Sequence, residues 1–130
     1  MRRSYLLFLS ALCMAAPIGA AAPSHDAWIF LGGRNLASGT ERETMTVISD
    51  RPFRQLQLCV FNTPLQLGTV SIHFDEGQPQ DVTVDQRIAR GECSQTIDLG
   101  HAPRHVRSVD LAYHSVSRFR RPPMVRIVGR

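Results

Sequence analysis

The chain has 130 residues, with 15 basic against 11 acidic side chains and a formal net charge of +4. That length leaves room for no more than one domain behind a leader segment. All the basic residues are arginines, whose planar guanidinium makes bidentate contacts to phosphate and carboxylate. Residues 101–130 hold seven arginines against Asp110 alone, a net charge of +6, whereas residues 23–100 hold six arginines against ten acids, a net charge of −4. A basic end of this kind can steer anions toward itself.

Residues 1–21 have the three parts of a secretory signal peptide: a basic start, an apolar run and a small-residue end. We expect cleavage after Ala21, because Gly19 and Ala21 then supply the small side chains that signal peptidase requires; a neighbouring alanine is the alternative site. Residues 22–130 would form a single exported domain, periplasmic or secreted. An uncleaved membrane anchor is the other interpretation, although the apolar run is barely long enough to span a bilayer.

Two cysteines, Cys59 and Cys93, remain in the mature chain. Export implies an oxidising compartment, so we predict one disulfide bond between them. Closing a loop of that size would stabilise the fold by roughly 3–4 kcal/mol. Two buried free thiols are the alternative.

Short apolar or alternating segments bounded by turn residues recur along the mature chain. The expected strands are residues 28–31, 44–48, 53–61, 69–74, 82–84, 93–99, 105–113 and 125–128. Residues 75–79 predict a hairpin turn in which Gly77 supplies a positive φ angle.

The segment 105–113 has the clearest alternation. Val109, Leu111 and Tyr113 share one parity, while Ser108 and Asp110 point the other way. This pattern is typical of a strand with one buried face, and we expect it to be a central strand of the core.

About eight short strands, with turn signals every 8–12 residues or so and no helical pattern, predict an all-β domain. We expect an antiparallel two-sheet β-sandwich, with a small closed β-barrel as the alternative. The connections are too short to hold the helices that parallel crossovers need.

The most suggestive functional segment is the basic loop at 118–121, at the tip of an expected hairpin. We predict that its guanidinium groups bind anions, assisted by two arginines at the start of the central strand. The anion-binding candidates are Arg104, Arg107, Arg118, Arg120 and Arg121. The bland interpretation is a solvated loop that protects a sheet edge, with arginines that pair with the chain's own acids.

Nothing in the sequence indicates a cofactor, a metal or catalysis. His105 and His114 differ by nine positions and would face opposite ways in one strand, which argues against a shared metal site. The acids around residues 75–85 lack EF-hand spacing and are expected to form an ordinary acidic turn. There is no nucleophile elbow, zinc-protease motif or phosphate-binding loop, so we expect no enzyme. Trp28 and Tyr113 are both expected in the core, which weakens a sugar-binding interpretation.

A set of short segments gives the chain a family resemblance. These segments are Trp28-Ile29-Phe30-Leu31-Gly32, Arg42-Glu43-Thr44, Ile97-Asp98-Leu99, Arg104-His105-Val106-Arg107-Ser108-Val109, Tyr113 and Val125-Arg126-Ile127-Val128-Gly129. Their layout resembles a family of small exported bacterial all-β proteins of unknown function. The resemblance implies export and an all-β fold, and it brings no catalytic residue with it.

The sequence therefore predicts an exported, non-enzymatic binding or interaction module. Its partner would be an anionic envelope lipid or glycan, or an envelope protein, rather than nucleic acid. One alternative is an assembly accessory that pairs with an envelope protein through a sheet edge. Another is a small hydrolytic or metal-dependent enzyme, suggested by the histidines alone.

Overall fold

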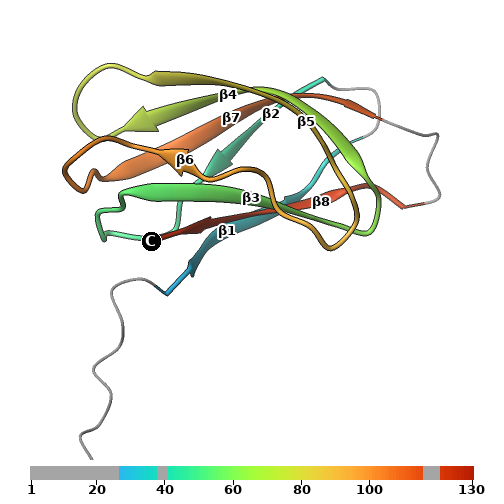
Figure 1. Cartoon of the computed structure of the whole chain (residues 1–130), viewed down its shortest axis with the longest axis horizontal. Coiled ribbons are helices and arrows are strands. Elements are labelled where there is room, and N and C mark those ends of the chain that lie inside the picture. The colour runs from blue at the N-terminus through green and yellow to red at the C-terminus, as the bar shows by residue number, and fades with distance from the viewer. Residues whose placement is uncertain (1–26, 38–40, 116–120) are drawn as a thin grey trace, which may run out of the picture.

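The computed structural model describes residues 27–37, 41–115 and 121–130 (Figure 1). The expected signal peptide lies outside the described residues, as do Arg118 and Arg120. The described residues contain no helix, and so none long and apolar enough to cross a membrane.

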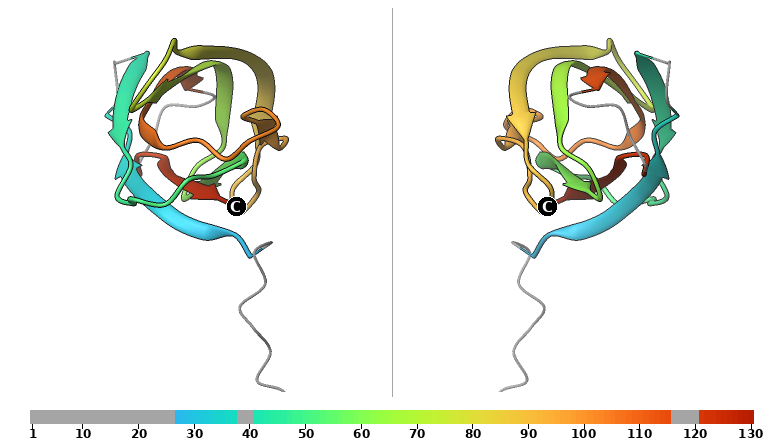
Figure 2. Two further views of the ribbon diagram at one scale, coloured as in Figure 1. Left: turned by 90° about the vertical axis from the view of Figure 1, so that its left-hand side faces the viewer. Right: turned by 90° about the vertical axis from the view of Figure 1, so that its right-hand side faces the viewer.

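Eight strands form two separate four-stranded sheets, and every strand pair is antiparallel. In chain order the strands are β1 (Ile29–Asn35), β2 (Arg42–Thr46), β3 (Gln55–Phe61), β4 (Leu65–Phe74), β5 (Gln80–Ile88), β6 (Ile97–Asp98), β7 (Val106–Ser115) and β8 (Met124–Gly129). The order is β1-β8-β3-β6 in the first sheet, here called sheet A, and β2-β7-β4-β5 in the second, sheet B. Figure 2, which looks roughly along the strands, shows the two layers. The sandwich prediction is confirmed and the closed barrel is wrong.

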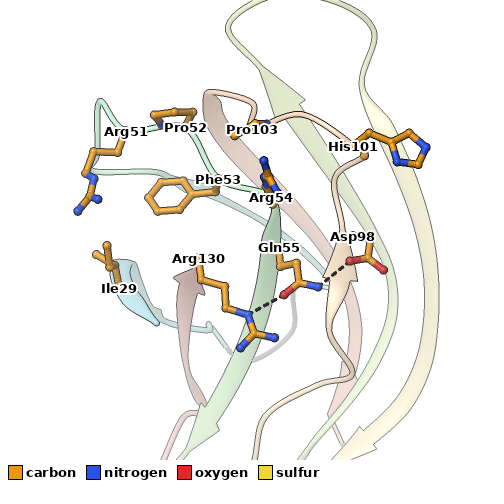
Figure 3. Close-up of a pocket in the computed structure, with 11 residues that line it drawn as sticks. Ile29, Arg51, Pro52, Phe53, Arg54, Gln55, Asp98, His101, Pro103 and Arg130 are labelled. Atoms are coloured by element: carbon orange, nitrogen blue, oxygen red, sulfur yellow. Dashed lines mark hydrogen bonds between the residues drawn. The ribbon is translucent and has the colours of Figure 1, made fainter. Parts of the chain in front are cut away.

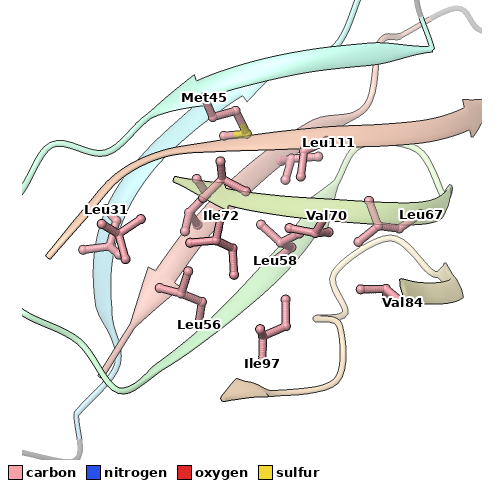
Figure 4. Close-up of a cluster of buried hydrophobic side chains, with 14 of the residues drawn as sticks. Leu31, Met45, Leu56, Leu58, Leu67, Val70, Ile72, Val84, Ile97 and Leu111 are labelled. Atoms are coloured by element: carbon pink, nitrogen blue, oxygen red, sulfur yellow. The ribbon is translucent and has the colours of Figure 1, made fainter. Parts of the chain in front are cut away.

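The expected central strand is an inner strand of sheet B, where β7 pairs with β2 on one side and β4 on the other. Its alternation holds as predicted: Val109, Leu111 and Tyr113 are buried, while Asp110 lies on the outer side. The inward side chains of both sheets fill one core between the layers (Figure 4). Burying each large aliphatic side chain there contributes about 1.5–3 kcal/mol.

Two local predictions are confirmed. Residues 75–79 turn the chain between β4 and β5, and Gly77 has a φ of 94°. The Cys59–Cys93 disulfide is present and ties β3 to the segment that leads into β6. Cys59 shares the outward parity of Gln55 and Gln57, so the bridge lies on the outer side of sheet A.

The expected hairpin around residues 118–121 is wrong. β7 belongs to sheet B and β8 to sheet A, so the connection between them crosses from one layer to the other. The reason is that β7 already has a hydrogen-bonded neighbour on each side, and β8 can pair only elsewhere.

Candidate anion-binding site

The predicted arginine candidates that the structure describes, Arg104, Arg107 and Arg121, do not form one cluster. Arg104 lies near the start of β7, where its guanidinium carbon is 3.4 Å from the centroid of the Phe74 ring at the end of β4. Arg107 is exposed near the same end of the sandwich. Arg121 lies at the other end, where its carbonyl accepts a hydrogen bond from the Thr63 hydroxyl just before β4 begins. The ten residues of β4 separate the two ends by roughly 30 Å.

A different group of arginines surrounds a cleft at the end of the sandwich where β1 and β3 begin. The cleft has a volume of about 960 Å³ (Figure 3). Three segments far apart in sequence supply its basic side chains, which are Arg51, Arg54, His101 and Arg130. Asp98 is the one acid in its lining. We call this cleft the end cleft.

Backbone hydrogen bonds hold the walls of the end cleft in place. The amides of Arg54 and Gln55 both donate to the Arg130 carbonyl, at 2.8 and 3.0 Å, and the Arg130 amide donates back to the Gln55 carbonyl at 3.0 Å. Phe53 and Arg104 exchange two further backbone bonds. The Phe53 ring is buried, and it lies so close to Gly129 that a Cβ there would come within 2.9 Å of it. The loop that carries Arg51 and Arg54 is therefore anchored to the core.

The guanidinium of Arg130 is oriented from two sides. Its Nε donates to Gln55 Oε1 at 2.6 Å, and Gln55 Nε2 donates in turn to Asp98 Oδ1 at 2.8 Å. Its guanidinium carbon lies 4.4 Å from the centroid of the Trp28 ring. Gln55 thus links Arg130 to one oxygen of Asp98. Among the described residues, no group accepts a hydrogen bond from the two terminal nitrogens of Arg130.

Few arginines pair with acids in the part of the chain that the structure describes. There, the Arg34–Glu43 pair, at 2.7 Å, is the one arginine–carboxylate contact within 4.0 Å. The end-cleft arginines have no such partner among the described residues. Internal ion pairing therefore does not account for their positions.

A second cleft of about 530 Å³ lies beside the first, and its lining has more acids than bases. Asp50, Asp75 and Glu76 line it together with Arg104 and His105. This composition does not favour an anion. Over the described ranges, no group of three or more His, Cys, Asp or Glu side chains is placed to hold a metal ion.

The first strand departs from the sequence interpretation. Tyr113 is in the core as expected, but Trp28 is only partly buried and Phe30 is 56% exposed. A register shift between Phe30 and Gly32 places Phe30 on the outer side, while Ile29 packs against the core and Leu31 is fully buried. An aromatic surface is thus present on the outer side of sheet A.

The outer side of sheet B carries a polar network that the sequence did not suggest. Asp110 accepts hydrogen bonds from the Thr44 hydroxyl and from His73 Nε2, both at 2.7 Å. Ser71 donates to Asp81 at 2.6 Å on the neighbouring strand. A carboxylate that orients an imidazole is one part of a hydrolytic site, but His73 lines neither of the two clefts.

The sequence did not indicate the end cleft, because its residues come together only where β3 pairs with β8 and with β6. The usable signal in the sequence was the pair of arginines, Arg51 and Arg54, that flank Pro52-Phe53.

Comparison with known proteins identifies a family and no function. A family model described as a domain of unknown function (DUF2541) matches residues 6–129. No curated protein and no solved structure matches the chain. The expected resemblance is confirmed in that the matching family has an unknown function. The chain belongs to the DUF2541 family.

Proposed function

We propose that this protein is an exported, non-enzymatic module that binds an anionic component of the cell envelope in the end cleft. The observation that carries the proposal is that Arg51, Arg54 and Arg130 line one cleft and have no carboxylate partner among the described residues. Guanidinium groups recognise carboxylate and phosphate oxygens through paired, charge-assisted hydrogen bonds.

The arrangement is suited to binding because part of it is already ordered. The Gln55 side chain and the Trp28 ring restrain Arg130, so less side-chain freedom is lost when a ligand arrives. The loop carrying Arg51 and Arg54 is likewise held by backbone bonds to Arg130 and to Arg104.

Export is supported by the signal-peptide pattern of residues 1–21 and by the Cys59–Cys93 disulfide, which is compatible with an oxidising compartment. The absence of a recognised catalytic motif in the sequence favours binding over catalysis.

The sheet edges give less support to the alternative of an assembly accessory. The longest edge strand is β5, which has nine residues. Its pairing with β4 is interrupted by a register shift, and Asp85 within it has a φ of 43°. Irregularities of this kind protect a strand edge from pairing with another chain.

Trp28 offers a direct test, because it is the one tryptophan of the chain and stacks on Arg130. Its fluorescence should change when galacturonate, or vesicles containing phosphatidylglycerol, are titrated into the protein. R54A/R130A should weaken the binding by about a hundredfold, because it removes two charge-assisted contacts that are each worth about tenfold. The binding should also weaken with added salt.

The control is R42A, which removes an exposed arginine from the outer side of sheet B. A second comparison, R118A/R120A/R121A, tests the basic loop. If R42A weakens binding as much as R54A/R130A does, the effect reflects net charge and the end cleft is not the site. If only the loop variant loses binding, the site lies at the other end of the sandwich.

A further inference from the structure

The outer side of sheet A carries a guanidinium between two aromatic rings. The guanidinium carbon of Arg126, on β8, lies 4.6 Å from the centroid of Phe61 on β3 and 5.9 Å from that of Phe30 on β1. Arg126 and Phe30 are exposed. Three adjacent strands of the sheet therefore contribute to one surface feature.

This packing prepares Arg126 to receive an anion. A guanidinium stacked against aromatic rings keeps its N–H groups at its edge, where they can donate to two oxygens of one carboxylate. In the described ranges of the chain, the Arg126 side chain has no hydrogen-bond or ion-pair partner.

The feature is continuous with the end cleft through β8. Arg126 and Arg130 have the same outward parity, four residues apart, so their Cα atoms are separated by roughly 13 Å. Arg130 both lines the cleft and stacks on Trp28. The outward positions between them on β3 and β8 hold no acid; they are Gln55, Gln57, Cys59 and Val128. One acid, Asp98 on β6, lies beside them opposite Gln55, whose amide donates to one of its oxygens. Because the two arginines outnumber this acid, charge complementarity favours an anionic ligand along the line.

We propose that the ligand is a linear acidic polysaccharide of uronate-type sugars, which enters the end cleft and continues across sheet A to Arg126. This rests on the proposed function and names its ligand class. A polymer with a carboxylate on successive sugar rings can place one carboxylate at Arg130 and another at Arg126. Once the first carboxylate is bound, the second binds intramolecularly, which raises the overall affinity. Gln57 gives its Nε2 to the Ser94 carbonyl, so its Oε1 is left to accept from a sugar hydroxyl.

Two other polyanions fit this surface less well. Nucleic acid binds such sheets by stacking bases on aromatic faces, but guanidinium groups lie over the rings of Trp28 and Phe61. A single lipid headgroup would contact one guanidinium and could not bridge the roughly 13 Å between Arg126 and Arg130.

The test compares galacturonate monomer with polygalacturonate oligomers, measured by Trp28 fluorescence and by calorimetry. The oligomer should bind roughly tenfold or more tightly than the monomer, the gain expected from one additional charge-assisted contact. R126A should reduce the oligomer's affinity to that of the monomer, and R126K should recover only part of the loss because lysine cannot make the bidentate contact. R42A is the matched control and should retain the gain.

The outcomes separate the two proposals. If the oligomer binds no more tightly than the monomer, or if R126A still binds the oligomer more tightly than the monomer, the outer side of sheet A is not part of the site. The end cleft remains the site in that case, provided that R54A/R130A weakens binding of the monomer. Arg126-dependent binding to phosphatidylglycerol vesicles, without Arg126-dependent binding to polygalacturonate, would overturn the polysaccharide in favour of a membrane. If neither probe responds to R54A/R130A, the end cleft itself is wrong.

Discussion

The two outer faces of the sandwich differ in chemistry although the sheets have the same number of strands. The face of sheet A carries aromatic rings with arginines stacked on them, and Cys59 of the disulfide. The face of sheet B carries threonine, serine, aspartate and histidine side chains that bond one another. A surface whose polar groups already have partners has little left for a ligand, whereas the arginines of sheet A have unused donors. This difference indicates which face is available for recognition.

The largest effect should come from the disulfide on the outer side of sheet A. C59A/C93A opens a link between residues 34 positions apart, and we expect it to lower the free energy of unfolding by about 3–4 kcal/mol. Urea unfolding of the oxidised protein and the variant would measure this. Wild-type protein under reducing conditions is the control and should lose a similar amount. A loss below about 1 kcal/mol would mean that hydrogen bonding and packing alone hold β3 to the β6 segment.

The polar network of sheet B should contribute less. D110A removes the acceptor for both Thr44 and His73, and we expect a loss of about 1–2 kcal/mol because Asp110 remains partly exposed. A double-mutant cycle with H73A isolates the pair. D110A should leave galacturonate binding unchanged; an altered affinity would contradict the assignment of recognition to sheet A.

The smallest effect should come from the stacked arginine itself. R126A should lower stability by about 0.5–1 kcal/mol through loss of its contacts with Phe61 and Phe30. R42A, on the other sheet, should change stability by less than about 0.5 kcal/mol, as surface substitutions usually do. Thermal unfolding of the two variants side by side would show whether the aromatic rings hold Arg126. If R126A and R42A change the stability equally, the aromatic rings of sheet A do not hold Arg126.

Much of the fold could be predicted because it depends on local patterns. The alternation around Val109, Leu111 and Tyr113 marked an inner strand, and Gly77 marked the β4–β5 turn. The β7–β8 connection could not be predicted the same way, because a loop between two strands looks alike whether it stays in one sheet or crosses to the other.

The site was harder to predict than the fold. Arg51 and Arg130 lie at distant positions in the chain, and only the pairing of β3 with β8 brings them to one cleft. The sequence drew attention to a local concentration of charge at 118–121 instead. Trp28 and Phe30 belong to a continuous apolar run, which has no alternation to show which side chains face outward.

The irregularity in β1 has a consequence for how this family could change. Because the register shifts by one between Phe30 and Gly32, the orientation of Phe30 depends on the number of residues in the strand as well as on their identity. Deleting one residue there would exchange Ile29 with Phe30 and direct a phenyl ring into a core that has no space for it. Over evolutionary time, a single-codon insertion or deletion could therefore create or abolish the aromatic surface in one step, where stepwise substitution would require several compensating changes.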